Sequence, residues 1–158
     1  MSKHQKPNTV RVLEQAGISC SLTEYPVDEA MDAVSVARKI GAEPERVFKT
    51  LVARGDKTGV EIFCLPGNAE LDLKTAAVIT GNKRVEMVKT DELMGLTGYV
   101  RGGCSPVGLK KPYRIYIDET AILFDRIYVS AGLRGLQLEV NAEELAGYVH
   151  ASFADIIK

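Results

Sequence analysis

The stretch VFKTLVARGDKTGVEIFCL, residues 47–65, decides the fold. Apolar and β-branched residues fill its two halves, which predicts one strand over 47–53 and another over 60–65. The GDKTG segment between them, residues 55–59, has the composition of a tight turn. We therefore predict an antiparallel β-hairpin near the middle of the chain.

Short helices and further strands are predicted on both sides of this hairpin. Capping residues and glycines mark helices from Asn8 or Thr9 to Gly17, from Asp32 or Ser35 to Gly41, from Asp72 to Gly81, over 91–96, and over 142–149 behind Asn141. Strands are predicted over 18–25, 85–88, 114–117, 127–130 and 136–140. Because these elements follow no regular βαβ order, we expect a single α+β domain over residues 1–158, with a partly closed, barrel-like mixed β-sheet and flanking helices.

Composition and charge limit the classes of function. The 158 residues are 46% hydrophobic, enough for one core, and 20 Lys and Arg against 21 Asp and Glu leave a formal net charge of -1. The overall field is therefore not that of a nucleic-acid-binding protein. Basic residues do gather between Arg101 and Arg114, with Lys110 and Lys111 between them, and RNA would bind there.

The cysteines and histidines favour neither a disulfide framework nor a zinc site. Cys20, Cys64 and Cys104 are odd in number and widely spaced, and only His4 and His150 could accompany them. We expect no metal and no cofactor. The chain shows no apolar leader and no membrane-length apolar run, so we expect a soluble, cytoplasmic protein.

Lys49 lies within the first strand of the hairpin. Strand alternation puts it on the same face as Val47 and Leu51. A buried ammonium group is costly unless it is paired or used. Lys49 is therefore either a functional residue or a strand-end lysine that reaches water or an unidentified carboxylate.

The GGCSPVG loop, residues 102–108, is the second candidate site. Its glycines allow positive φ, and successive N–H groups in such loops can bind an oxyanion or a phosphate. It lacks the GK[ST] ending of a Walker loop, and an ordinary glycine-rich turn is the alternative. Nothing in the sequence marks Cys104 as a thiolate, so a packed cysteine is favoured over a nucleophile.

The YVSAGLRG segment, residues 128–135, brings a serine and an arginine to the end of a strand. Both histidines lie at the ends of the chain, so a Ser-His-Asp triad around Ser130 is not expected. Ser130 is better interpreted as a hydrogen-bonding residue, with a solvated turn serine as the alternative.

These segments occur together in an order that resembles the YbaK family. The matching stretches are TEYP (23–26), VFKTLV (47–52), LDLK (71–74), KRVEM (83–87), TGYV (97–100), GGCSPVG (102–108), IYVSAG (127–132) and RGL (134–136). The chain is similar also to the editing domain inserted in some bacterial prolyl-tRNA synthetases. The resemblance implies a barrel-like α+β fold and deacylation of tRNA that carries the wrong amino acid, typically cysteine on proline tRNA.

The resemblance also implies roles for individual residues. Lys49 would be the key polar residue, Gly103 would line the site through its backbone and bind the carbonyl oxygen through its N–H, and Ser130 would position the substrate. The residues expected to bind substrate are Tyr25, Met31, Gly102, Ser105, Pro106, Gly132 and Arg134. The family is thought to use a substrate-assisted mechanism, in which the cysteine thiol attacks its own ester, so no side chain need be a nucleophile.

Three departures from the family pattern leave the substrate open. Met31-Asp32 occupies a stretch where an aromatic residue is frequent, and Leu133 and Gln137 replace common residues of the later motif. The alternatives are a deacylase for alanine or serine on proline tRNA, or a catalytically silent binding or regulatory module of the same fold. The implied partners are the acceptor end of tRNA and prolyl-tRNA synthetase.

Overall fold

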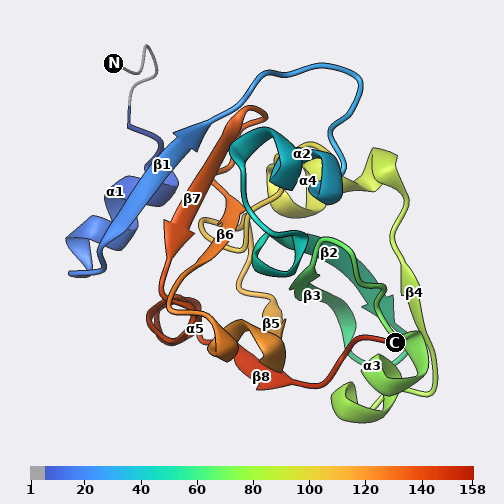
Figure 1. Cartoon of the computed structure of the whole chain (residues 1–158). Helices are drawn as coiled ribbons and strands as arrows, with labels where there is room; N and C mark the ends of the chain where they lie inside the picture. The colour runs from blue at the N-terminus through green and yellow to red at the C-terminus, as the bar shows by residue number, and fades with distance from the viewer. Residues whose placement is uncertain (1–5) are drawn as a thin grey trace.

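The computed structural model describes residues 6–158, so His4 and the first five residues of the expected domain lie outside the described residues (Figure 1). The predicted hairpin is confirmed as β2 (Phe48–Gly55) and β3 (Gly59–Pro66). The two strands pair in antiparallel register from Phe48 opposite Pro66 to Gly55 opposite Gly59. Strand alternation therefore sends Ile62 and Cys64 to one face of the sheet, and Phe63 and Leu65 to the other.

The hairpin forms the centre of a five-stranded sheet with the order β4-β2-β3-β5-β8. Its other strands are β4 (Val85–Met87), β5 (Arg114–Asp118) and β8 (Ser152–Ala154). Strand β5 runs parallel to β3 and β8 parallel to β5, while β4 is antiparallel to β2, so the sheet is mixed as expected. The sequence did not predict β8, because three residues are too short for alternation to show.

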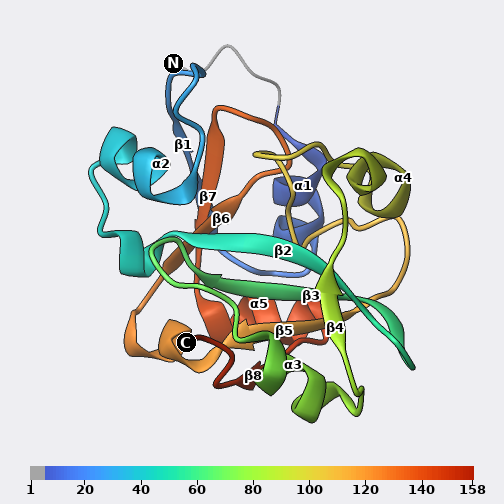
Figure 2. The ribbon, with the colours of Figure 1, turned by 90° about the vertical axis from the view of Figure 1, so that its right-hand side faces the viewer.

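A second, three-stranded antiparallel sheet has the order β1-β7-β6. It contains β1 (Cys20–Glu24), β6 (Ile127–Ser130) and β7 (Leu136–Val140). In Figure 2, β6 and β7 run across the direction of β2 and β3. The two sheets are linked by one isolated bridge, between Val47 and Tyr128. The α+β class is confirmed, but the expected barrel-like sheet is two sheets that do not close into a barrel, because β6 joins β2 at this single point.

Five α-helices flank the sheets in the described chain: α1 (Asn8–Gln15), α2 (Ala33–Ile40), α3 (Leu73–Thr80), α4 (Leu93–Thr97) and α5 (Ala142–Val149). Asp32, Asp72 and Asn141 cap their helices through side-chain hydrogen bonds, as predicted. The helix predicted over 91–96 is instead a 3₁₀ turn, Thr90–Glu92, followed by α4.

The predicted cap of the first helix is wrong. Pro7 is the capping residue of α1 and makes no side-chain capping bond. Asn8 lies inside the helix, and the Thr9 hydroxyl donates to the Ala131 carbonyl at 2.6 Å instead of capping. The Thr9 side chain, which the local sequence indicated as a possible cap, is thus hydrogen-bonded to a residue distant in the sequence.

Two apolar clusters hold these layers together. The larger contains residues of both sheets, such as Ile62 and Val129, together with Leu13 of α1 and Leu145 of α5. The smaller lies on the other face of the five-stranded sheet, where Phe63 and Leu65 meet Ala76 and Ala77 of α3. None of the helices described in residues 6–158 has both the length and the apolar character that a membrane crossing requires.

Candidate functional site

A cavity of about 720 Å³ opens where the start of β2, the end of β6 and the β1–α2 loop meet. This volume lies within the range of small-molecule sites, roughly 300 to 1,000 Å³. Six residues of the predicted site line it: Tyr25, Met31, Lys49, Gly102, Ser130 and Arg134. Gly103, Ser105, Pro106 and Gly132 are not among its lining residues.

Lys49 is half-buried in the wall that β2 contributes. Its Nζ donates to the Gly67 carbonyl at 3.3 Å. Burial lowers the Lys49 pKa from its ordinary value of 10.5, and the negative charges of Glu70 and Asp32 partly oppose this effect. In the described part of the chain no carboxylate forms an ion pair with Lys49. Its ammonium group is therefore available to an anionic or polar ligand in the cavity.

Gly67, which accepts this hydrogen bond, was missed by the sequence analysis. A Cβ atom at Gly67 would lie 2.7 Å from the Ala33 Cβ and 3.1 Å from the Val47 carbonyl oxygen. The close approach lets α2 begin directly against the strand that carries Lys49. In the sequence Pro66-Gly67 indicates merely the end of a strand, so no local signal could have identified it.

Ser130 ends β6 and is 7% exposed. Its Oγ accepts the Gly132 N–H at 3.1 Å, which is the local bond typical of a turn serine. Gln137 lies opposite it in β7 and also lines the cavity. Gln137 Oε1 and Tyr25 Oη are buried without a hydrogen-bond partner among residues 6–158. This side of the cavity therefore holds hydrogen-bonding capacity that the described protein leaves unused.

The glycine loop contributes Gly102 and Cys104 to the cavity wall. Gly102 has φ 86°, and a Cβ there would lie 3.3 Å from Arg134 Nε. The Gly103 N–H, expected to bind the substrate carbonyl, donates to the Val100 carbonyl at 3.0 Å. In this structure the Gly103 amide therefore closes a turn.

The remaining predicted site residues, Ser105, Pro106 and Gly132, lie next to the cavity wall without lining it. Ser105 is fully buried, and its Oγ accepts the Val107 N–H at 3.2 Å. Pro106 is buried beside it. Gly132 has φ 99°, and a Cβ there would lie 3.0 Å from the Tyr99 ring. Ser105 and Pro106 therefore belong to the glycine loop and Gly132 to the turn after β6, and none of the three lines the cavity.

Cys104 lines the cavity yet lacks the character of a nucleophile. Burial raises the pKa of its thiol to about 11, and a hydrogen bond with Thr97 opposes the increase only in part. At neutral pH the group is a protonated thiol. Its side chain is 8% exposed and belongs to the larger apolar cluster, in agreement with the packed interpretation.

Charges of opposite sign lie in different parts of the wall. Arg101 and Arg134 line the cavity beside the glycine loop, and Arg134 Nε donates to the Arg101 carbonyl at 3.0 Å. Asp28, Glu29 and Asp32 line it from the β1–α2 loop. Of the basic stretch expected to bind RNA, Arg101 reaches this cavity, whereas Lys110, Lys111 and Arg114 do not line it.

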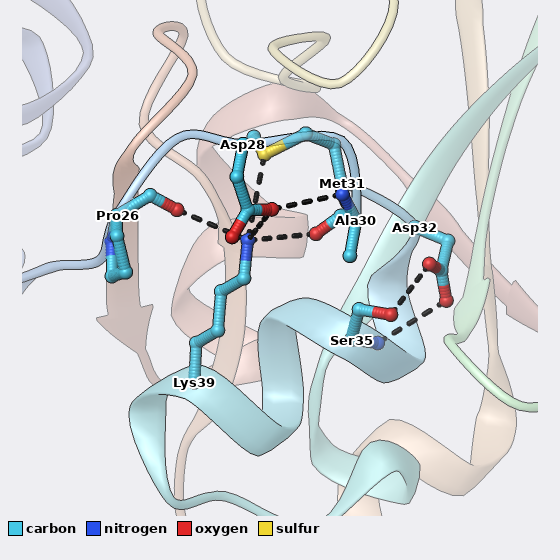
Figure 3. A network of polar contacts seen from close by, with 7 residues as sticks. All are labelled: Pro26, Asp28, Ala30, Met31, Asp32, Ser35 and Lys39. Atoms are coloured by element: carbon cyan, nitrogen blue, oxygen red, sulfur yellow. Dashed lines mark hydrogen bonds and ion pairs between the residues drawn. The ribbon is translucent and has the colours of Figure 1, made fainter.

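A second lysine, which the sequence analysis did not identify, contacts the acidic wall. Lys39 of α2 extends into the β1–α2 loop, where its Nζ contacts several loop acceptors (Figure 3). From sequence alone Lys39 is a basic residue in the last turn of a helix, which is common and has a local explanation.

Comparison with known proteins shows which family the chain resembles. A model of the aminoacyl-tRNA editing domain matches residues 27–148. The chain is 44% identical over 153 residues to EbsC of Enterococcus faecalis, provisionally named a Cys-tRNA(Pro)/Cys-tRNA(Cys) deacylase, covering 96% of this chain and 93% of EbsC. It is 32% identical over 135 residues to the proline–tRNA ligase of Shouchella clausii, covering 85% of this chain and 23% of the ligase. Among solved structures, one provisionally described as a trans-editing enzyme for prolyl-tRNA synthetase superimposes with a TM-score of 0.84 at 28% identity, covering 98% of this chain and 99% of the other.

Proposed function

Because the chain belongs to the aminoacyl-tRNA editing domain family, we propose that it hydrolyses the ester bond of misacylated tRNA, with cysteine on proline tRNA as its main substrate. The proposal treats residues 1–158 as one editing domain. The observation that carries it is the cavity in which Lys49, which has no carboxylate partner among residues 6–158, lines the same space as Ser130, Arg101 and Arg134. A tRNA end that carries phosphates, a ribose and a small amino acid matches this combination of charge and hydrogen-bonding groups.

The residues at the cavity favour substrate-assisted chemistry over a protein nucleophile. The Cys104 thiol is protonated at neutral pH, and His150, the one histidine among residues 6–158, does not line the cavity that Ser130 lines. The substrate thiol would attack the ester carbonyl, so that a carbon–sulfur bond forms as the carbon–oxygen bond to the ribose breaks. The thiol attacks as a thiolate after its proton has passed to solvent, the departing ribose oxygen takes a proton from water, and water then opens the cyclic thioester to free cysteine.

The protein would contribute positioning and electrostatic stabilisation. Lys49 would hold the terminal adenosine or the ester by charge, Arg101 and Arg134 would bind the last phosphates, and Ser130 would orient the ribose or the amino acid. For Gly103 to stabilise the developing negative charge, its N–H would have to exchange the Val100 carbonyl for the substrate on binding.

Release of labelled amino acid from cysteinyl-, alanyl- and seryl-tRNA(Pro) tests the proposal. We expect release from the cysteinyl substrate to be fastest, and Lys49→Ala to reduce it on the order of 100-fold, the usual loss when one preorganised charge or donor is removed. Lys57→Ala is the matched control, because Lys57 is exposed in the hairpin turn and does not line the cavity. A wild-type protein that releases none of the three amino acids above the uncatalysed rate would support the silent binding module instead.

The dependence on pH separates attack by the substrate thiol from attack by water. Exchange of sulfur for oxygen changes size little, so pocket fit alone gives a preference of roughly 10- to 200-fold at most. A thiol with a pKa near 8.5 is partly ionised close to neutral pH, whereas an alcohol is not. The ratio of single-turnover rates for cysteinyl- over seryl-tRNA should therefore rise between about pH 6 and 9. A ratio that stays flat favours water attack and the deacylase of broader specificity.

We propose prolyl-tRNA synthetase as a protein partner. A protein of this size and charge can contact little more than the single-stranded acceptor end, so choice of tRNA would come from a second protein. The likeness to part of a proline–tRNA ligase supports prolyl-tRNA synthetase as that protein. We expect the cytoplasm as its location, because charged tRNA is made there.

A further inference from the structure

The β1–α2 loop, residues 25–32, forms one wall of the cavity although little apolar burial holds it in place. Each residue from Pro26 to Ala30 is exposed, and no helix or strand is formed there. Within the described chain, residues 26–31 make no backbone–backbone hydrogen bond. Such a segment would be expected to sample many conformations. Something other than the core must therefore define the shape of this wall.

Lys39 supplies the missing contacts. From α2 its Nζ donates to the Asp28 carboxylate at 2.7 Å, the Ala30 carbonyl at 2.7 Å and the Pro26 carbonyl at 3.0 Å. Figure 3 shows the ammonium group between these acceptors, with the Met31 sulfur, 3.8 Å away, above it. An ammonium group has three hydrogens to donate, and here three oxygens from different loop residues converge on it.

The surroundings of Lys39 strengthen this arrangement. Its side chain is 14% exposed and that of Asp28 is 55% exposed, so the ammonium end of the ion pair is largely covered while the carboxylate remains in contact with water. Its Nζ lies 5.9 Å from the centre of the Tyr25 ring, another lining residue. The Asp28 carboxylate also accepts the Ala30 N–H at 2.8 Å, which ties the loop to itself at the same point.

We propose that Lys39 is a positioning residue for amino-acid selectivity: by gathering Pro26, Asp28 and Ala30 onto one ammonium group, it fixes the wall that carries Met31 and Asp28 into the cavity. This inference rests on the proposed deacylase function. Lys39 itself is not among the lining residues, so it acts through the loop and has no contact with the substrate. A wall held in one shape can reject amino acids that a mobile wall would admit, because an amino acid that does not fit a fixed wall is bound more weakly.

Three variants separate the parts of the proposal. Lys39→Met keeps most of the apolar side chain and removes the charge and all three donors. Lys39→Arg keeps the charge, but its planar, larger guanidinium cannot reproduce three bonds converging on one small group. Asp28→Ala removes one acceptor from an exposed position, so it endangers folding least. Lys57→Met controls for the loss of a positive charge elsewhere on the surface.

Hydrogen–deuterium exchange and kinetics are measured on the same proteins. In Lys39→Met we expect faster exchange in peptides that cover residues 25–32, unchanged exchange in the β2–β3 hairpin, and a fall of about tenfold or more in the ratio of kcat/KM for cysteinyl- over alanyl-tRNA(Pro). The fall should come from KM, with kcat retained, because loss of a wall weakens ground-state and transition-state binding alike. Lys39→Arg should behave like Lys39→Met, and Asp28→Ala should show a smaller change in the same direction.

The outcomes are distinguishable from failure of the proposed function. A wild-type protein without deacylase activity defeats that function, while the exchange data still show whether Lys39 holds the loop. An active wild type whose exchange and selectivity are both unchanged in Lys39→Met and Asp28→Ala overturns the inference alone. If Lys39→Arg retains full selectivity, the requirement for three hydrogen bonds converging on one small ammonium group is overturned, because a positive charge at this position would then be enough to hold the loop.

Discussion

Lys49 and Lys39 have the same side chain in opposite surroundings. Lys39 donates to a carboxylate and two carbonyls, whereas Lys49 donates to a single carbonyl at the longer distance of 3.3 Å. A lysine whose donors are all satisfied by its own protein can hold a loop, but it has nothing left for a ligand. A half-buried lysine that contacts no anion keeps hydrogen-bond donors and a charge with which a ligand can interact.

The titration of Lys49 tests this description. Burial disfavours the charged form, so we expect its midpoint, followed by NMR of labelled lysine side chains and assigned with Lys49→Arg, to lie below 10.5. Below the folded-state pKa of Lys49, the folded protein bears the full cost of burying the charge. This cost disappears as the pH rises from the folded-state pKa to 10.5, the ordinary value. Lys49 therefore makes the free energy of unfolding increase with pH over that interval. A midpoint at or above 10.5 would mean that the carboxylates of Glu70 and Asp32 outweigh burial.

Cys104 provides a second test at the scale of one residue. Because its thiol pKa is raised to about 11, Cys104→Ala should keep deacylase activity within several-fold of wild type. Cys104→Ser is the control, because it keeps the size of the side chain and changes the reacting atom. Removal of a covalent nucleophile costs thousands-fold or more, so a loss of that size in single-turnover release would show that the protein thiol attacks.

At the scale of the element, the strands and helices predicted correctly are those whose signals are local. Asp32, Asp72 and Asn141 cap helices through their own neighbours, and the hairpin turn follows from five consecutive residues. The exceptions depend on distant groups. The Thr9 hydroxyl donates to the carbonyl of Ala131, which is distant in the sequence. Strand β8 forms by pairing with the exposed edge of β5.

The candidate site shows the same division. The family resemblance predicted Lys49 and Ser130 as site residues, and both line one cavity, Lys49 from β2 and Ser130 from the end of β6. The glycine loop lines the cavity through Gly102 and Cys104, whereas the Gly103 N–H, expected to face the substrate, closes a turn onto the Val100 carbonyl. Gly67 and Lys39 matter through contacts with α2 and the β1–α2 loop, which no pattern within either segment reveals.

Two glycine substitutions test the packing of α2 against the hairpin. Gly67→Ala should lower the free energy of unfolding by about 1 to 3 kcal/mol, because the new Cβ would lie 2.7 Å from Ala33, and should also reduce activity by shifting the acceptor of Lys49. Gly147→Ala, in α5 with open space around its Cβ position, should raise that free energy by about 0.5 to 1 kcal/mol. Both changes in the free energy of unfolding are to be measured by denaturant unfolding. Equal effects would show that the close contact at Gly67 relaxes without cost.

At the scale of the whole molecule, the site exists because two sheets meet at a single bridge. Had β6 continued to pair with β2 beyond Val47 and Tyr128, the strands would cover the space that the cavity now occupies. The barrel that the sequence suggested is thus interrupted at the place where the functional residues gather. The same arrangement leaves Arg101 and Arg134 beside the opening, although the protein as a whole carries a formal charge of -1.

This charge distribution predicts how tRNA binding responds to salt. Lys49, Arg101 and Arg134 are the basic residues that line the cavity. If Arg101 and Arg134 each neutralise one phosphate of the single-stranded acceptor end, as proposed above, the logarithm of the affinity for tRNA(Pro) should fall with the logarithm of salt concentration with a slope of about −1.4, from roughly −0.7 for each contact. Arg134→Ala should make the slope shallower by about 0.7, whereas Lys111→Ala, away from the cavity, should leave it unchanged. A much steeper slope that Lys111→Ala reduces would mean that the exposed basic residues outside the cavity carry the RNA, as the sequence first suggested.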